Sequence, residues 1–133
     1  MSDTFTPAAR AIFDKQVLAH VACLDLNGGP HVTPVWVALD GDVVIINTAL
    51  GRAKARFLAN DSRVAVSLTD PDNPYVCIAL RGIVTGFSTD GADDVIDALA
   101  KKYLGVDSYP MRREGEVRVT VRISPVHISV QPE

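Results

Sequence analysis

The most constraining feature of this chain is a strict alternation of apolar and polar residues near its C-terminus. Apolar β-branched residues occupy every second position of a seven-residue run and polar residues lie between them: Val117, Arg118, Val119, Thr120, Val121, Arg122 and Ile123. Successive side chains of a strand point to opposite faces, so the run predicts a strand with one buried and one wet face. Eighteen valines in 133 residues extend this bias to the whole chain and predict a mainly β fold.

Turn signals divide the rest of the sequence into further short strands. Asn27 to Pro30 form a glycine-containing hairpin signal, and Asp40-Gly41-Asp42 form another. The predicted strands are residues 17–25, 31–39, 43–46, 64–69, 75–87, 117–123 and 126–130. The third is apolar throughout, so we expect it to be central and covered on both faces. Pro125 is expected to separate the last two.

Three segments have helical character. Thr6 and Pro7 are typical of a helix start, residues 51–60 are rich in helix formers, and Thr89-Asp90 precede an amphipathic run. About seven mostly antiparallel strands with two or three short helices predict an antiparallel barrel or sandwich. We expect residues 1–133 to form a single domain.

Composition argues against several classes of function. The net charge of −3 favours neither nucleic acid nor an anionic membrane as a partner. No apolar run reaches the length of a membrane-spanning helix, and Met1 to Thr4 lack the features of a signal peptide, so we expect a cytoplasmic protein. Cys23 and Cys77 lie in apolar stretches and are predicted to be core thiols.

The usual catalytic patterns are missing from the sequence. The three histidines lack metal-ligand spacing, the serines lack a nucleophile motif, and neither type of glycine-rich nucleotide loop occurs. We therefore predict no metal site, and neither a hydrolytic triad nor a nucleotide-binding loop is supported.

Basic residues gather where a strand gives way to a helix. Thr48 and Gly51 are followed by Arg52, Lys54 and Arg56. A helix N-terminus attracts anions, and arginine and lysine bind phosphate, so the segment is a candidate phosphate site. A solvated helix face is the alternative that these residues alone leave open.

The sequence resembles the pyridoxamine 5′-phosphate oxidase-like superfamily, in particular its actinobacterial branch that uses the deazaflavin cofactor F420. The resemblance lies in four blocks: residues 29–37 (GPHVTPVWV), 40–42 (DGD), Thr48 with 51–58 (GRAKARFL), and 61–66 (DSRVAV). It implies an FMN-binding split barrel-like fold, in other words a split β-barrel, and a homodimer with cofactor sites at the subunit interface.

The resemblance also implies roles for single residues. Arg52 and Lys54 would hold the cofactor phosphate with Thr48 as a hydroxyl partner, and Thr33 would donate a hydrogen bond to the ring system. Trp36 would line the ring system of the cofactor. The alternative is that Trp36 packs in the core or at the dimer interface. The candidate cofactor-binding residues are Thr33, Pro34, Val35, Trp36, Thr48, Gly51, Arg52, Lys54 and Arg56.

Two departures from the family pattern narrow the expected activity. Phe57 stands where relatives often have asparagine, and residues 126–133 lack the arginine-containing segment of true pyridoxamine phosphate oxidases. The missing segment disfavours oxidation of vitamin B6. The resemblance implies an F420-dependent reductase that transfers a hydride to a small unsaturated or quinone-like substrate, and because the deazaflavin does this chemistry itself, it implies that no catalytic side chain is required. An FMN-binding oxidoreductase and a non-catalytic cofactor-binding protein are the alternatives. Arg112 and Arg113 are candidates to meet the acidic tail of F420.

Overall fold

The computed structural model describes residues 4–132 and contains seven strands and three helices. Met1 to Asp3, which belong to the segment without signal-peptide features, and Glu133 lie outside the described residues. The elements in chain order are α1 (Pro7–Phe13), β1 (Ala19–Leu24), β2 (Pro30–Val35), β3 (Ala38–Asp40), β4 (Val43–Ala49), α2 (Ala53–Asn60), β5 (Arg63–Thr69), β6 (Cys77–Ser88), α3 (Ala92–Leu104) and β7 (Arg118–Gln131).

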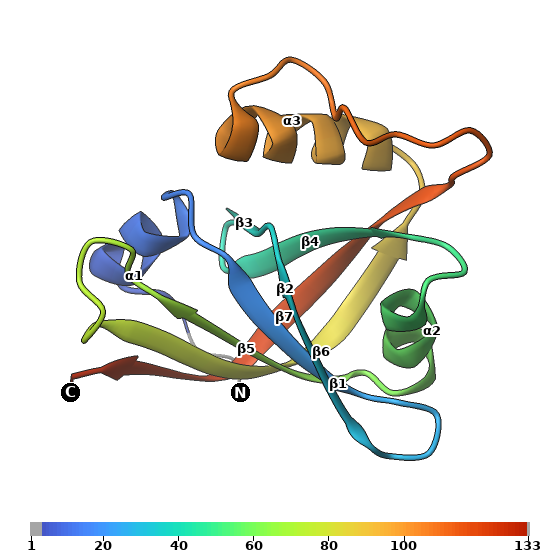
Figure 1. Ribbon diagram of the computed structural model, residues 1–133. Helices are drawn as coiled ribbons and strands as arrows, with labels where there is room; N and C mark the ends of the chain where they lie inside the picture. The colour runs from blue at the N-terminus through green and yellow to red at the C-terminus, as the bar shows by residue number, and fades with distance from the viewer. Residues whose placement is uncertain (1–3, 133) are drawn as a thin grey trace.

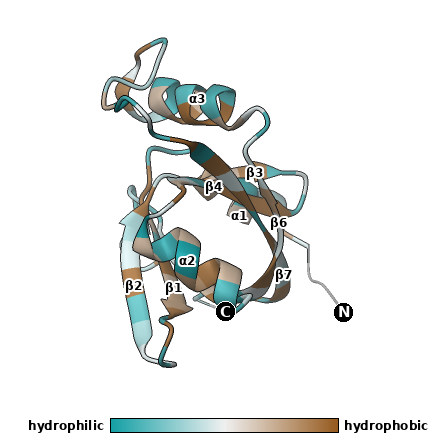
Figure 2. Cartoon of the chain, turned by 90° about the vertical axis from the view of Figure 1, so that its right-hand side faces the viewer, coloured by the Kyte–Doolittle hydropathy of each residue, from teal (hydrophilic) through white to brown (hydrophobic). Residues whose placement is uncertain are grey.

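All seven strands belong to one antiparallel sheet in the order β2-β1-β5-β6-β7-β4-β3. The sheet curls around a core to which α1 contributes Phe13 and the strands contribute residues such as Val21, Ile46 and Ile78. Figure 1 shows the long strands β6 and β7 crossing the molecule diagonally, and Figure 2 shows α2 across one end of the barrel. The predicted mainly β, split-barrel fold is confirmed.

Two predicted strand boundaries are wrong. Residues 31–39 form two strands, because β2 pairs with β1 whereas β3 pairs with β4, and the chain changes partner at Trp36 and Val37. Pro125 does not end a strand, since β7 continues through it opposite Gly82, where the register shifts. A Cβ at Gly82 would lie 2.6 Å from the carbonyl oxygen of Ser124, so glycine allows this close approach.

Helix α3 covers part of the sheet face, at residues 117–123, that the sequence predicted to be exposed to solvent. It packs on β7 and β4, above the barrel in Figure 1. Arg118 is 5% exposed and Thr120 is 6% exposed, so the polar face predicted for residues 117–123 is buried at these positions. The same helix covers β4, whose Ile45 and Ile46 are both buried, as predicted for a strand covered on both faces. The helix begins after Gly91, which has a φ of 72°, and not at Thr89-Asp90.

The end of α3 is tied to the segment between β2 and β3. Lys102 Nζ donates to the carbonyl oxygen of Val37 at 2.7 Å and also to that of Phe13. The Tyr103 hydroxyl accepts a hydrogen bond from the Val37 N–H at 3.1 Å. These contacts fix the chain beside Trp36. Within residues 4–132, no helix has the length and apolar character needed to cross a membrane.

Candidate functional site

The entry to α2 has the geometry predicted for an anion site. Gly51 has a φ of 88°, which an L side chain rarely adopts, so glycine is required for this turn. Arg52 is the N-cap residue of α2, and its side chain makes no capping hydrogen bond. The first N–H groups of the helix therefore lack a side-chain acceptor. Thr48 lies just before this turn and is 6% exposed.

A cavity of about 300 Å³ opens beside this turn. Its walls come from β2, β4, α2, α3 and β7 and from the segments before β1, after β2 and after α3. The lining residues are Leu18, Pro34, Val35, Trp36, Asn47, Thr48, Arg52, Lys54, Ile96, Leu99, Tyr109, Met111 and Arg118. The fold thus brings most of the candidate residues from β2 and from the β4–α2 turn to one place.

Three candidate residues lie outside the lining of this cavity. Gly51 shapes the turn without contributing a side chain. Thr33 lies next to Pro34 on β2, and its Oγ1 is buried without a hydrogen-bond partner among the described residues. Arg56 is exposed on α2, with its guanidinium 6.0 Å from the ring centroid of Phe57.

Lys54 is a half-buried cation on the cavity wall. It has neither an ion pair nor a hydrogen bond with any described residue. Burial lowers its pKa, and the charge of Arg52 acts in the same direction, while Cys23 opposes both. A cation held with so little compensation favours a bound anion.

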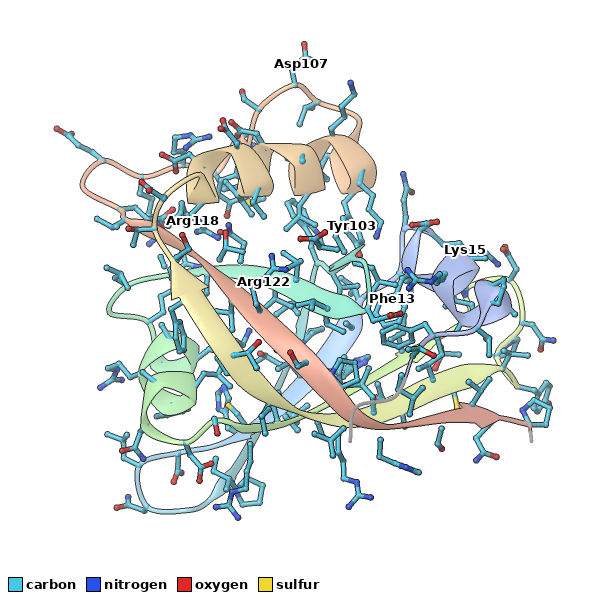
Figure 3. All side chains as sticks on the ribbon, turned by 180° about the vertical axis from the view of Figure 1, so that it is seen from behind. Phe13, Lys15, Tyr103, Asp107, Arg118 and Arg122 are labelled. Atoms are coloured by element: carbon cyan, nitrogen blue, oxygen red, sulfur yellow. The ribbon has the colours of Figure 1, made fainter. Side chains whose placement is uncertain are left out.

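A charge network of Arg52, Glu116 and Arg118 adjoins Lys54. Arg52 Nη2 donates to Glu116 Oε2 at 2.8 Å, and Arg118 Nη1 donates to Glu116 Oε1 at 3.0 Å. Arg118 Nε also donates to Asn47 Oδ1 at 2.9 Å. Figure 3 shows Arg118 under α3, at the start of β7. Sequence reasoning missed Arg118, because its alternation with valine indicated a solvent-facing position.

Aromatic rings form another part of the wall. The ring of Trp36 stacks on Tyr103 with centroids 5.2 Å apart, and its edge meets Tyr109 at 6.0 Å. Tyr109 is held in place because its N–H donates to Asp97 Oδ1 at 2.8 Å. Trp36 is therefore a fixed, largely apolar surface at the cavity. Tyr109 and Met111 lie in the connection between α3 and β7.

Arg112 forms two ion pairs within the described chain. Its guanidinium pairs with Asp93 at 2.9 Å and with Asp97 at 2.5 Å, both on α3. It thus ties the connection after α3 to the helix. The predicted contact of Arg112 and Arg113 with an acidic cofactor tail stays a prediction.

A larger cavity lies elsewhere on the described chain. It measures about 510 Å³ and runs over the outer face of β1, β5 and β6, with residues such as Ala22, Ala65 and Ile83 in its lining. The lining of this cavity is mainly apolar and lies on an open sheet face. Such a face suits contact with another protein surface.

Comparison with known proteins agrees with this architecture. A solved F420 reductase is 26% identical with a TM-score of 0.82, over 94% of this chain and 98% of its own. Rv2991 of Mycobacterium tuberculosis shares the fold, with 19% identity and a TM-score of 0.76 over 97% of this chain and 85% of its own. General Stress Protein 26 of Bacillus anthracis also shares it, with 18% identity and a TM-score of 0.68 over 90% of this chain and 88% of its own. None of the curated proteins matches. The pyridoxamine 5′-phosphate oxidase family model matches residues 5–131, and the chain belongs to this family.

Proposed function

We propose that this protein binds F420 and acts as an oxidoreductase on a small unsaturated or quinone-like molecule. The observation that carries the proposal is Lys54, a half-buried cation without a counter-ion among the described residues, beside Arg52 at the N-terminus of α2. The likeness to an F420 reductase over nearly the whole of both chains supports this choice of cofactor.

The residues of the cavity fit a phosphate-bearing ring cofactor. Lys54, Arg52 and the first N–H groups of α2 would hold the phosphate, because they combine positive charge with free donors. Pro34, Val35 and Trp36 would face the ring system with apolar surface and exclude water from it. When bound, the deazaflavin supplies the hydride chemistry itself, so the chain needs to bind, orient and shield it.

We further propose that a homodimer completes the site. Dimers are typical of this family. The cavity opens beside Pro34, whose side of β2 continues into the apolar outer sheet face. A second copy on that face would approach the cavity and cover the ring.

FMN is the alternative cofactor, because its terminal phosphate would suit the same cations and the matched family is that of an FMN-type oxidase. A non-catalytic cofactor-binding protein is the other alternative. Turnover of quinone-like acceptors with reduced F420 separates an enzyme from such a binding protein.

Fluorescence titration of the purified protein with F420 and with FMN tests the proposal. We expect tighter binding of F420, and a loss of about 10- to 100-fold in the Lys54→Ala variant, as removal of a charge-assisted hydrogen bond predicts. Lys101→Ala removes an exposed lysine of α3 and serves as the matched control, with no expected change. Unchanged F420 affinity in Lys54→Ala would overturn the phosphate assignment, and tighter binding of FMN would favour the alternative cofactor.

A further inference from the structure

Glu116 bridges two arginines beside the candidate cofactor cavity. Its Oε2 accepts a hydrogen bond from Arg52 at 2.8 Å, and its Oε1 accepts one from Arg118 at 3.0 Å. The side chain of Glu116 is 9% exposed. Solvent therefore screens its charge less than it screens an exposed carboxylate.

The two arginines differ in what they can offer to a ligand. The side chain of Arg118 is 3% exposed, donates to Asn47 as well as Glu116, and lies over the ring of Tyr109 at 5.2 Å. The side chain of Arg52 is 47% exposed and lines the cavity. A ligand anion would therefore meet Arg52 and Lys54, with the carboxylate of Glu116 directly behind Arg52.

Glu116 is ionised in this environment. Burial acts to raise its pKa, but the hydrogen bonds and charges of Arg118 and Arg52 outweigh burial and hold the pKa below its usual value. Arg52, Lys54 and Arg118 carry three positive charges, and Glu116 cancels one of them. Each further negative charge on a ligand at Arg52 is repelled by this fixed carboxylate.

We propose that Glu116 sets the charge selectivity of the anion site, by weakening the binding of a dianionic phosphomonoester more than that of a monoanionic phosphodiester. The proposal rests on the proposed function, since it places the cofactor phosphate at Arg52 and Lys54. F420 carries its phosphate as a diester with one charge, and the carboxylates of its acidic tail are attached beyond that phosphate, where salt screens them from Glu116. FMN ends in a monoester, which carries nearly two charges above the second phosphate pKa of about 6. Glu116 thus reduces the electrostatic advantage of FMN.

The test is a titration of wild type and Glu116→Gln with riboflavin, FMN and F420 at pH 8. For about 6 Å between the charges, the loss of Glu116 changes the affinity at least roughly threefold per ligand charge, which is the value for screening by bulk water. We expect Glu116→Gln to tighten F420 about threefold and FMN about tenfold, and to leave riboflavin, which has no phosphate, unchanged. Glu114→Gln removes the same charge from an exposed position in the same loop, and we expect no change in this control.

The outcomes distinguish a role of Glu116 in charge selectivity from a purely structural role, and both from a failure of the proposed function. An equal change for FMN and F420, or no change, overturns the role of Glu116 while F420 binding to wild type still stands. If wild type binds none of the three, the proposed function itself fails. Glu116→Asp keeps the charge, so we expect the FMN-to-F420 affinity ratio of wild type. A roughly threefold shift of that ratio in the Asp variant, which is the shift expected for Glu116→Gln, would overturn the proposal even where the Gln variant does not fold.

Discussion

Thr33 carries a buried hydroxyl on β2 that no described residue satisfies. A buried polar group without a partner costs about 1–3 kcal/mol, and valine has nearly the same shape as threonine. We therefore expect Thr33→Val to raise the free energy of unfolding of the ligand-free protein by about 1 kcal/mol, measured by denaturant titration.

Thr85→Val is the matched control for this substitution, because the Thr85 hydroxyl lies on another strand and already has a partner, Ser124 Oγ, at 3.0 Å. We expect no stabilisation in the control. A loss of stability in Thr33→Val would show that the hydroxyl is satisfied in solution. Weaker F420 binding by a stabilised Thr33→Val would support the predicted hydrogen bond to the cofactor ring.

The residues of the site divide into those with a local signal and those without one. Gly51, Arg52 and Lys54 are close in sequence, so a glycine turn with cations at a helix start was recognisable before the fold was known. Arg118 and Glu116 reach the same place only because β7 pairs with β4. Nothing in the alternating pattern around Arg118 indicates that pairing, and its burial could not be predicted.

At the scale of elements, Lys102 and Tyr103 at the end of α3 hold the segment between β2 and β3. Lys102→Met would leave the carbonyl oxygens of Phe13 and Val37 without this donor. We expect a loss of roughly 1–3 kcal/mol in the free energy of unfolding, measured by denaturant titration. Trp36 is the single tryptophan of the chain and stacks on Tyr103, so its fluorescence should shift to the red as α3 loosens.

Lys101→Met changes the same charge on the same helix at an exposed position and is the matched control. It should alter neither the free energy of unfolding nor the Trp36 emission. If the two methionine variants behave alike, the contacts of Lys102 do not hold α3 in place.

The elements show where pattern reasoning succeeds. Alternation and turn residues predicted all the strand-forming regions, because these signals act within a few residues. The change of partner at Trp36 and Val37 was missed, since an apolar run is compatible with one long strand or with two short ones. The burial of Thr120 was missed for a different reason, because it follows from where α3 packs.

At the scale of the whole molecule, the outer face of the sheet leads into the candidate site. Pro30, Val32 and Pro34 point to the same side of β2, and each lines a different one of three neighbouring cavities. On the neighbouring strands β1 and β5, the small side chains of Ala22 and Ala65 leave this face of the sheet flat. Val32 is 61% exposed on it. An apolar surface that ends at the cofactor cavity is the expected place for a second copy of the chain.

We therefore expect wild type to sediment as a dimer at micromolar concentration and Ala65→Arg to sediment with the mass of one chain, 14.3 kDa. Arginine at position 65 would project from an open sheet face, so the variant should stay folded, while its charge and length would block close contact between two copies. The variant should also bind F420 more weakly, because the partner would no longer cover the cavity beside Pro34. Ala11→Arg places the same residue on the exposed side of α1 and should leave mass and affinity unchanged. A monomeric wild type, or a dimeric Ala65→Arg variant with full affinity, would show that this face does not complete the site.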